Sequence, residues 1–405
     1  MARILSLTAR FPYPPYRGDK RRALHIISHL GSTHEHHLLS FVERDDPSTR
    51  QGAAQLEKMV ASVTTVTLPR WRSLANLPLL SYRRLPFQAL YYASREMRRR
   101  VRQRVQEIKP DLVLAHLFRT APYALGLRVP LLVDLTDVIS FEVENALPYI
   151  SPLKRWAYAI EARRIAQFEN MLARRADGVM LCSPRDASIL RSRVPEVEPF
   201  VVPNVVDMQV FSRDGGTYDP NLIIFCGCLH GRHNEQPVLR FVRRIMPRVK
   251  QRRPQARFHL VGMAPSRRMQ ALIKAGIASH ECHAATEEYV RAMQRAAVSV
   301  VPMAFAAGTQ CKVLESLAAG VPVVTTTVSN DGLGGNPDEH VLVEDDDARF
   351  ADRVVQVLDD AGLRQALSVN GRRLIEQHFT MRAMAGPLEA AVEEAIARGR
   401  ARLRR

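Results

Sequence analysis

The segment GTQCKVLESLAAGVPVV, residues 308–324, has the pattern of a glycine loop, a short helix and a buried strand. Gly308 lets bare backbone approach a ligand, and a helix beginning near Lys312 directs its first unpaired amides toward that loop. Gly320 ends the helix, and the apolar residues 321–324 are typical of a strand inside a parallel sheet. The pattern predicts an α/β fold with a ligand site at the loop.

The side chains of this segment favour a nucleotide as the ligand. Amides at a helix start favour phosphate, Lys312 adds a full positive charge and Thr309 adds a hydroxyl. Glu315 lies one helical turn after Lys312 on the same face, where its two oxygens suit neighbouring hydroxyl groups. An ordinary helix with a solvated Lys–Glu pair explains these residues equally well, because a lone glycine loop is a weak signal.

The segment resembles the signature of the group-one glycosyltransferases. The resemblance implies a retaining enzyme of the GT-B type, an α/β protein whose two Rossmann-like, doubly wound domains face a cleft. In such enzymes a Glu at the position of Glu315 holds the ribose of a sugar nucleotide. Two further stretches, RFPYPPYRGDK at residues 10–20 and VDLTDVIS at residues 133–140, are similar to the sugar transferases associated with PEP-CTERM/exosortase exopolysaccharide systems.

Short apolar stretches alternate with helical segments along the 405 residues, as βαβ units require. The chain is longer than one core supports, so two domains are expected. Turn residues cluster near 207–220 and place an acceptor-binding domain at 1–210 and a nucleotide-sugar-binding domain at 211–380. The resemblance implies that a helix in 381–405 packs back toward the first domain. The expected strands are 4–8, 37–42, 63–68, 112–115, 131–135, 179–182 and 200–202, then 222–226, 258–261, 298–301 and 321–324.

Ligands of open α/β sheets bind at the carboxyl ends of the strands, so polar residues there are candidates. In the second domain, Arg232 follows the strand 222–226 and is a second candidate cation for a diphosphate. In this interpretation Asn234 caps the helix that follows. A surface arginine near a helix cap is the structural alternative for Arg232.

Three strand ends of the first domain carry further candidates. Gly18 follows the first strand, and we expect its backbone to approach the donor while Arg17 and Asp19 contact the acceptor or a sugar. His116 ends the fourth strand, where similar enzymes often place a histidine that contacts the donor sugar. Asp137 follows the fifth strand and is a candidate contact for sugar hydroxyls. The structural alternatives are a proline-stiffened turn, a structural histidine and a capping aspartate.

One position departs from the family pattern. Many group-one glycosyltransferases have a second Glu eight residues before Glu315, in contact with the donor sugar, but this chain has Ala307 there. The histidine-rich stretches of the sequence lack the ligand spacing of metal sites. We expect neither a metal nor another cofactor, because Lys312 and Arg232 suffice to neutralise a leaving diphosphate.

The formal net charge of +17 favours anionic partners. Residues 74–92 mix Leu, Phe and Tyr with Arg, and an Arg-rich helix is expected over 95–104, a combination that resembles an interfacial membrane contact. A core-packing helix with a solvated basic face is the alternative. No nucleic-acid-binding motif is visible. Without a signal-peptide pattern and with an odd number of cysteines, the chain is expected in the cytoplasm, on the inner face of the cytoplasmic membrane if it binds lipid.

Together with the family resemblance, these observations predict a metal-independent glycosyltransferase of the hexosyltransferase type. We expect it to move a sugar from a nucleotide-diphosphate sugar to a glycan or lipid-linked acceptor in exopolysaccharide biosynthesis, with His116, Lys312 and Glu315 at the reacting groups. A non-catalytic scaffold that binds a sugar nucleotide or a membrane is the alternative. An oxidoreductase is disfavoured, because the first strand does not lead into Gly-x-Gly-x-x-Gly.

Overall fold

The structure is a computed structural model that describes residues 1–42, 47–68, 85–211, 217–229, 231–282 and 286–404. Its contacts divide the chain into two compact units. The first comprises Met1–Pro203 together with Met384–Arg405, and the second comprises Asn204–Ala383. Each unit has its own parallel sheet and its own hydrophobic core.

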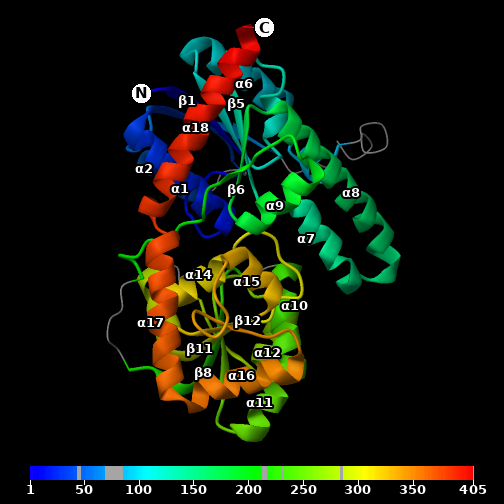
Figure 1. Ribbon diagram of the computed structural model, residues 1–405, viewed down its shortest axis with the longest axis vertical. Helices are drawn as coiled ribbons and strands as arrows, with labels where there is room; N and C mark the ends of the chain where they lie inside the picture. The colour runs from blue at the N-terminus through cyan, green and yellow to red at the C-terminus, as the bar shows by residue number, and fades with distance from the viewer. Residues whose placement is uncertain (43–46, 69–84, 212–216, 230, 283–285, 405) are drawn as a thin grey trace. The chain divides into compact units, whose positions relative to one another are not determined.

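The first unit is built on a parallel sheet with the strand order β3-β2-β1-β4-β5-β6-β7. Its inner strands are buried apolar runs, as expected where helices cover both faces of a sheet (Figure 1). The strands are β1 (Arg3–Thr8), β2 (Glu35–Val42), β3 (Ser62–Thr67), β4 (Leu112–His116), β5 (Leu131–Thr136), β6 (Gly178–Leu181) and β7 (Phe200–Val201).

The helices of this unit connect successive strands. The 24-residue helix α8 is the longest of them before the C-terminal helix, and its lower end in Figure 1 extends beyond the sheet. The elements are α1 (Gly18–Thr33), α2 (Pro47–Leu56), α5 (Phe87–Tyr91), α6 (Arg95–Ile108), η1 (Ala121–Tyr123), α7 (Ile139–Ala146), η2 (Leu147–Tyr149), α8 (Pro152–Arg175) and α9 (Pro184–Arg193).

The C-terminal helix α18 (Met381–Arg404) packs on the first unit (Figure 1). The carboxylate of Glu389 lies 2.8 Å from Nε2 of both His29 and His34. Further along, Arg402 donates to both carboxylate oxygens of Asp177 at 2.8 and 2.9 Å. The end of the chain therefore completes the unit in which the chain begins.

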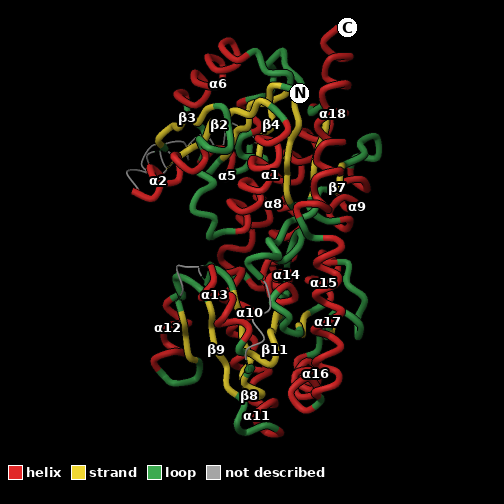
Figure 2. Tube along the Cα trace, turned by 90° about the vertical axis from the view of Figure 1, so that its left-hand side faces the viewer, coloured by secondary structure: helices red, strands yellow, loops and turns green. Residues whose placement is uncertain are grey.

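The second unit has a parallel sheet with the strand order β10-β9-β8-β11-β12-β13. Figure 2 labels three neighbouring strands of this sheet, β9, β8 and β11. Phe225, Phe241 and Phe350 are fully buried in its core. The strands are β8 (Asp219–Cys226), β9 (Arg257–Val261), β10 (Ser279–Glu281), β11 (Ala296–Val301), β12 (Val323–Thr325) and β13 (Leu342–Val343).

The first long helical segment of this unit is irregular. Pro237 lies inside α10, and a π-helical stretch, Phe241–Ile245, separates α10 from α11. The helices are α10 (Arg232–Arg240), α11 (Met246–Arg252), α12 (Arg267–Lys274), α13 (Thr286–Gln294), α14 (Cys311–Ala318), α15 (Thr327–Leu333), α16 (Asp347–Asp359) and α17 (Ala361–His378).

The structure differs from the sequence-based expectation in four places. The chain changes unit after Pro203 rather than at 210, because Val206 and Phe211 are buried in a core of the second unit. Strands β10 and β13 were not predicted. Strand β12 begins at Val323, because the backbone amide of Val321 still donates to Ser316 in the turn after α14.

Both sheets have the strand order of a doubly wound fold. In the first unit β1 has β2 on one side and β4 on the other, and in the second unit β8 lies in the same way between β9 and β11. At such a reversal the loops that leave the two neighbouring strands diverge, and they open a crevice at the carboxyl ends of the strands. Ligand-binding residues are therefore expected in the loops after β1, β4, β8 and β11.

Strand β2 buries His36 in a way that makes folding depend on pH. The ring is 1% exposed and its Nε2 lies 2.7 Å from Oγ of Ser6. Burial, followed by the neighbouring His37 and His34, lowers the pKa of His36 from 6.5 to about 3. The folded chain therefore binds fewer protons than the unfolded chain between these pH values, so stability falls as the pH drops below 6.5.

We expect His36→Gln to flatten this dependence. One proton corresponds to a slope of about 1.4 kcal/mol per pH unit in the free energy of unfolding. Urea unfolding at pH 7.0, 6.0 and 5.0 measures the slope for both chains. A wild-type slope equal to that of His36→Gln would show that His36 does not carry the effect.

Candidate functional site

The loop before α14 takes its shape from glycine. Gly308 has a φ of +58°, in the left-handed region that favours glycine. Gly332 packs against it so closely that a Cβ there would lie 1.9 Å from the carbonyl oxygen of Gly308. Helix α14 begins at Cys311, and its N-cap residue, Gln310, provides no side-chain capping hydrogen bond. The loop places the start of α14 beyond the carboxyl end of β11, beside the strand reversal of the second sheet.

Lys312 is a buried cation in the first turn of α14, with 7% of its surface exposed. Its Nζ donates to Oε1 of Gln310 at 3.0 Å and lies 5.9 Å from the ring centroid of Phe225. Gln310 is itself held, because its Nε2 donates to the carbonyl of Ala307 at 2.9 Å and its Oε1 lies 3.0 Å from Nε2 of His233. An ammonium group fixed in this way is suited to an anionic ligand.

Glu315 is 1% exposed, and its Oε2 accepts a hydrogen bond from the hydroxyl of Tyr289 at 2.7 Å. Burial, followed by the charge of Glu315, raises the pKa of the Cys226 thiol to about 11. The alternative of a solvated Lys–Glu pair is wrong, because both Lys312 and Glu315 are buried. A buried carboxylate on the same helix face as a buried ammonium has the chemistry needed for a diol next to a phosphate.

The other predicted donor residues have different surroundings. The hydroxyl of Thr309 donates to the carbonyl of Gly332 at 2.7 Å, so it stabilises the loop. Arg232 is the first residue of α10, but its side chain lies outside the described residues, and its role stays a prediction. The expectation that Asn234 caps this helix is wrong: the N-cap is Gly231, and Asn234 donates from within the helix to the carbonyl of Cys228.

Sequence reasoning missed three residues that position this pair of charges. Gln310 lies within residues 308–324, but an uncharged amide is a weak signal of a binding site. His233 and Tyr289 come from α10 and α13, far from α14 in the sequence, and no local pattern marks them. Their contribution follows from the order of the strands, which brings the ends of these helices to one edge of the sheet.

The first unit gathers His116, Asp134 and Arg22 at its own strand reversal. Nδ1 of His116 lies 2.8 Å from Oδ2 of Asp134, and its Nε2 lies 3.1 Å from the carbonyl oxygen of Asp19. The guanidinium of Arg22 donates to both carboxylate oxygens of Asp134 at 2.9–3.1 Å and to the carbonyl of Val202 at 2.8 Å. The predicted histidine is therefore held by a buried ion pair that the sequence reading did not identify.

The electrostatics of this cluster follow from its burial. Burial alone would raise the pKa of Asp134, but the charge of Arg22 and the hydrogen bond with His116 hold it well below its usual range. The cluster also has strained backbone beside it. Leu117 and Thr136 have φ values of +65° and +68°, in a region that branched side chains rarely adopt. Such strain is common where a fold positions functional groups.

The loop after β1 brings Arg17, Gly18 and Asp19 to the same edge. Helix α1 begins at Gly18, directly after Arg17. The carboxylate of Asp19 forms an ion pair with Arg10 and lies 3.4 Å from Nε of Arg17. Burial opposes ionisation of Asp19, but Arg10 and Arg17 lower its pKa to about 2. The structure thus brings Asp19 and His116 together, as the contact between Nε2 of His116 and the carbonyl of Asp19 shows.

Asp137 lies in a different environment. Its Oδ1 accepts from Sγ of Cys182 at 3.0 Å. Burial, followed by the charge of Asp186, raises the pKa of Asp137 to about 7. It follows β5, the next strand beyond β4 in the sheet, and its described side-chain hydrogen bond is to Cys182 rather than to His116. A contact of Asp137 with sugar hydroxyls remains a prediction.

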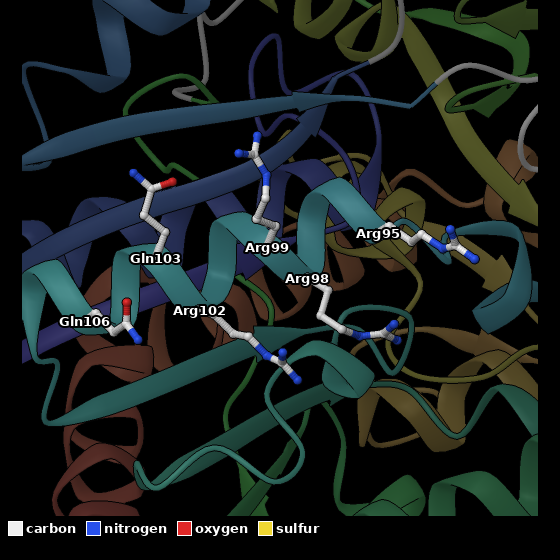
Figure 3. Close-up of a pocket in the computed structure, with 6 residues that line it drawn as sticks. All are labelled: Arg95, Arg98, Arg99, Arg102, Gln103 and Gln106. Carbon is white, nitrogen blue, oxygen red and sulfur yellow. The ribbon is translucent and has the colours of Figure 1, made fainter.

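Helix α6 carries the basic surface that the sequence suggested. Figure 3 shows Arg98 and Arg102 on one side of the helix and Arg99 on the other, around a hollow lined by side chains of this helix. Its inner face contributes Met97 and Val101 to the core of the first unit. Residues 74–84 of the predicted membrane contact lie outside the described residues, and within 87–91 Ala89 and Leu90 are buried.

The described residues can also be compared with the patterns of metal sites and of membrane-spanning helices. In this part of the chain, no three His, Cys, Asp or Glu side chains converge in the manner of metal ligands. Across the same residues, no helix is both long enough and apolar enough to span a bilayer.

Two family descriptions match the chain, one in each unit. Residues 17–205 match "Glycosyl transferase 4-like domain", and residues 220–360 match "Glycosyl transferases group 1". A similar protein is the uncharacterized 44.6 kDa protein in the cps region of Klebsiella pneumoniae. It is 22% identical over 392 residues, which cover 94% of this chain and 97% of that protein.

Solved structures share the fold over almost the entire chain. Anabaena HepE in complex with UDP has a TM-score of 0.66 at 14% identity, with 96% of this chain and 99% of HepE covered. Sucrose-phosphate synthase from Thermosynechococcus elongatus has a TM-score of 0.72 at 16% identity, with 98% and 99% covered. The likeness to these structures shows that the chain has the GT-B fold. Because glycosyltransferase families match residues 17–205 and 220–360, the chain belongs to the group 1 glycosyltransferases.

Proposed function

We propose that this glycosyltransferase takes its sugar from a nucleotide-diphosphate sugar bound at the start of α14. Glu315 binds the ribose hydroxyls, and Lys312 with the backbone of Gly308 and Thr309 binds the diphosphate. The observation that carries this proposal is the burial of Lys312 and Glu315 on one face of α14 at the strand reversal. The similar HepE has been solved with UDP and with UDP-glucose, which supports a nucleotide sugar as the donor.

The proposed chemistry is retaining and independent of metal. As the glycosidic bond breaks, negative charge grows on the leaving diphosphate, and the fixed ammonium of Lys312 stabilises it without reorganisation. The acceptor hydroxyl attacks from the face that the diphosphate leaves, and a diphosphate oxygen takes its proton. His116, oriented by Asp134, steadies the donor sugar. Ala307 leaves the donor sugar without the carboxylate that the family pattern places there.

We further propose that the acceptor is a glycan or a lipid-linked glycan of an exopolysaccharide pathway. The match to a protein of a cps region supports this. So does the likeness to WaaG, a glycosyltransferase involved in lipopolysaccharide biosynthesis, which has a TM-score of 0.62 at 16% identity over 96% of this chain. A lipid-linked acceptor requires the protein to work at the cytoplasmic face of a membrane.

The first half of α8 supports membrane contact. Leu153, Trp156 and Ile160 lie along one side of this helix at helical spacing and are 83%, 66% and 45% exposed. Lys154 and Arg155 are exposed among them. Aromatic and aliphatic side chains beside basic groups are typical of helices that lie in the interface of an anionic bilayer.

Replacing Lys312 tests the donor site. We expect Lys312→Ala to weaken binding of the matching nucleoside diphosphate by about 10- to 100-fold, because one charge-assisted contact to phosphate is lost. The affinity for the nucleoside should change by less than about threefold, because the nucleoside has no phosphate for Lys312 to contact. Isothermal titration of the full chain with UDP, GDP and ADP, then with the nucleoside of the best ligand, measures both quantities.

Lys274→Ala is the matched control, because Lys274 is an exposed lysine in α12 of the same unit. It should bind the nucleoside diphosphate as the wild type does. If Lys312→Ala lowers the affinity for the nucleoside as much as the affinity for the nucleoside diphosphate, the substitution has damaged the fold. If the affinity for both ligands is unchanged, Lys312 does not contact the donor.

A further inference from the structure

Arginine side chains gather at the strand reversal of the first unit. Arg10 and Arg17 follow β1, and Arg119 follows β4. These strands are neighbours, and their last residues, Thr8 and His116, are partners in the sheet register. The three arginines therefore leave the sheet at the carboxyl edge where ligands of doubly wound folds bind.

Arg119 is held in place without a carboxylate. Its Nε and Nη2 donate to Oε1 of Gln88 at 3.0 and 2.5 Å. Its guanidinium carbon lies 5.9 Å from the ring centroid of Tyr92 and 5.7 Å from that of Phe118. Among the described residues no carboxylate forms an ion pair with Arg119. An amide oxygen and two ring faces thus orient a full positive charge that they do not neutralise.

Two further guanidinium groups and one carboxylate lie close enough to Arg119 to act on its charge. Arg10 and Arg17 both pair with the carboxylate of Asp19. With Arg119, these four groups comprise three guanidinium ions and one carboxylate, a formal sum of +2. Burial, followed by the charge of Arg10, lowers the pKa of Arg119 to about 10, so the cations repel one another. A bound anion would relieve that repulsion.

We infer that Arg17 and Arg119, with the Arg10–Asp19 pair beside them, form a subsite for an oxyanion of the acceptor, a phosphate or a carboxylate group. The planar fork of a guanidinium matches both groups. This inference rests on the proposed function, in which Lys312 of the second unit binds the donor diphosphate and the first unit binds the acceptor. The arginines of the first unit then serve a different anion, and the acceptor is acidic.

Arginine labelling by phenylglyoxal, mapped by peptide mass spectrometry on the full chain, tests the subsite. Arg17 is the reporter, because its side chain is 49% exposed. We expect inorganic phosphate to slow the labelling of Arg17 by about tenfold relative to chloride at equal ionic strength, as one or two charge-assisted contacts imply. Arg102, an exposed arginine of α6, is the control and should be slowed equally by both salts.

The variant Arg119→Gln removes the oriented charge. We expect phosphate protection of Arg17 to fall below about twofold in this variant, because the partner that shares the anion is lost. Arg119→Lys keeps the charge but loses the fork, and it should retain part of the protection. The proposed subsite is wrong if phosphate does not protect Arg17 from labelling in the wild type. It is also wrong if phosphate protects Arg17 fully in a folded Arg119→Gln chain.

The source of the anion is tested by adding UDP as a probe. If the anion belongs to the acceptor, phosphate protects Arg17 equally in the wild type, with or without UDP, and in Lys312→Ala. If UDP alone gives the full protection and Lys312→Ala abolishes it, the arginines bind the donor diphosphate and the inference is wrong. If the chain binds no nucleotide, the proposed donor site is wrong. The protection of Arg17 by phosphate would still show whether the arginine subsite exists.

Discussion

Glu315→Ala should weaken binding of the matching nucleoside diphosphate by about 100-fold or more. The proposed carboxylate accepts hydrogen bonds from two ribose hydroxyls, and each bond to a charged group contributes about 1.5–3 kcal/mol, with 1.4 kcal/mol per tenfold in affinity. Truncation also leaves the hydroxyl of Tyr289 without the acceptor it has at 2.7 Å. Isothermal titration of the full chain measures the loss, and kcat/KM for transfer should fall by at least the same factor.

A ligand lacking the 2′-hydroxyl gives the matched control for this prediction. If Glu315 contacts that hydroxyl, the 2′-deoxy nucleotide binds the wild type more weakly, but it binds Glu315→Ala as well as the ribose form does. Glu393→Ala, at an exposed position of α18, should behave as the wild type with both ligands. If the loss of affinity caused by Glu315→Ala and the loss caused by removing the 2′-hydroxyl are additive, the ribose does not contact Glu315.

Asp134→Asn should destabilise the first unit by about 3–5 kcal/mol, the usual cost of leaving one member of a buried ion pair without its partner. Arg22 is 3% exposed and Asp134 is fully buried, so solvent cannot replace the missing charge. The same change removes the carboxylate that orients His116. Chemical denaturation followed by circular dichroism measures the stability, with the first unit expected to unfold at lower denaturant concentration than the second.

Two further variants separate the ion pair from general damage. Arg22→Met combined with Asp134→Leu removes both charges and should recover most of the lost stability, because neither partner is left buried and unpaired. Glu394→Gln breaks an exposed pair with Arg398 and should cost no more than about 1 kcal/mol. If Asp134→Asn costs no more than Glu394→Gln, the buried pair does not hold the first unit together.

Much of the fold could be predicted from the sequence, because buried parallel strands are short apolar runs with turn residues at their ends. Strands β10 and β13 were missed for the opposite reason. Strand β10 reads Ser-His-Glu, and β13 is two residues long, so neither has an apolar run to detect. Both lie at the edges of their sheet, where pairing with a single neighbour suffices.

The candidate site was less accessible to sequence reasoning. Lys312 and Glu315 are three positions apart in one helix, so local spacing reveals them. Arg22 and Asp134 are separated by 112 positions, and their pairing depends on the order β1-β4-β5 in the sheet. An arginine in a helix and an aspartate in an apolar strand have no shared local pattern. Only the topology reveals that one neutralises the other.

The most direct test of the donor site is a crystal structure of the full chain with the nucleoside diphosphate that titration selects. We expect ribose hydroxyls within about 3 Å of the Glu315 carboxylate, the usual hydrogen-bonding distance, and phosphate oxygens at Lys312 and the backbone of Gly308. A nucleotide bound elsewhere, with the Glu315 carboxylate in contact only with protein groups, would contradict a donor site at the start of α14.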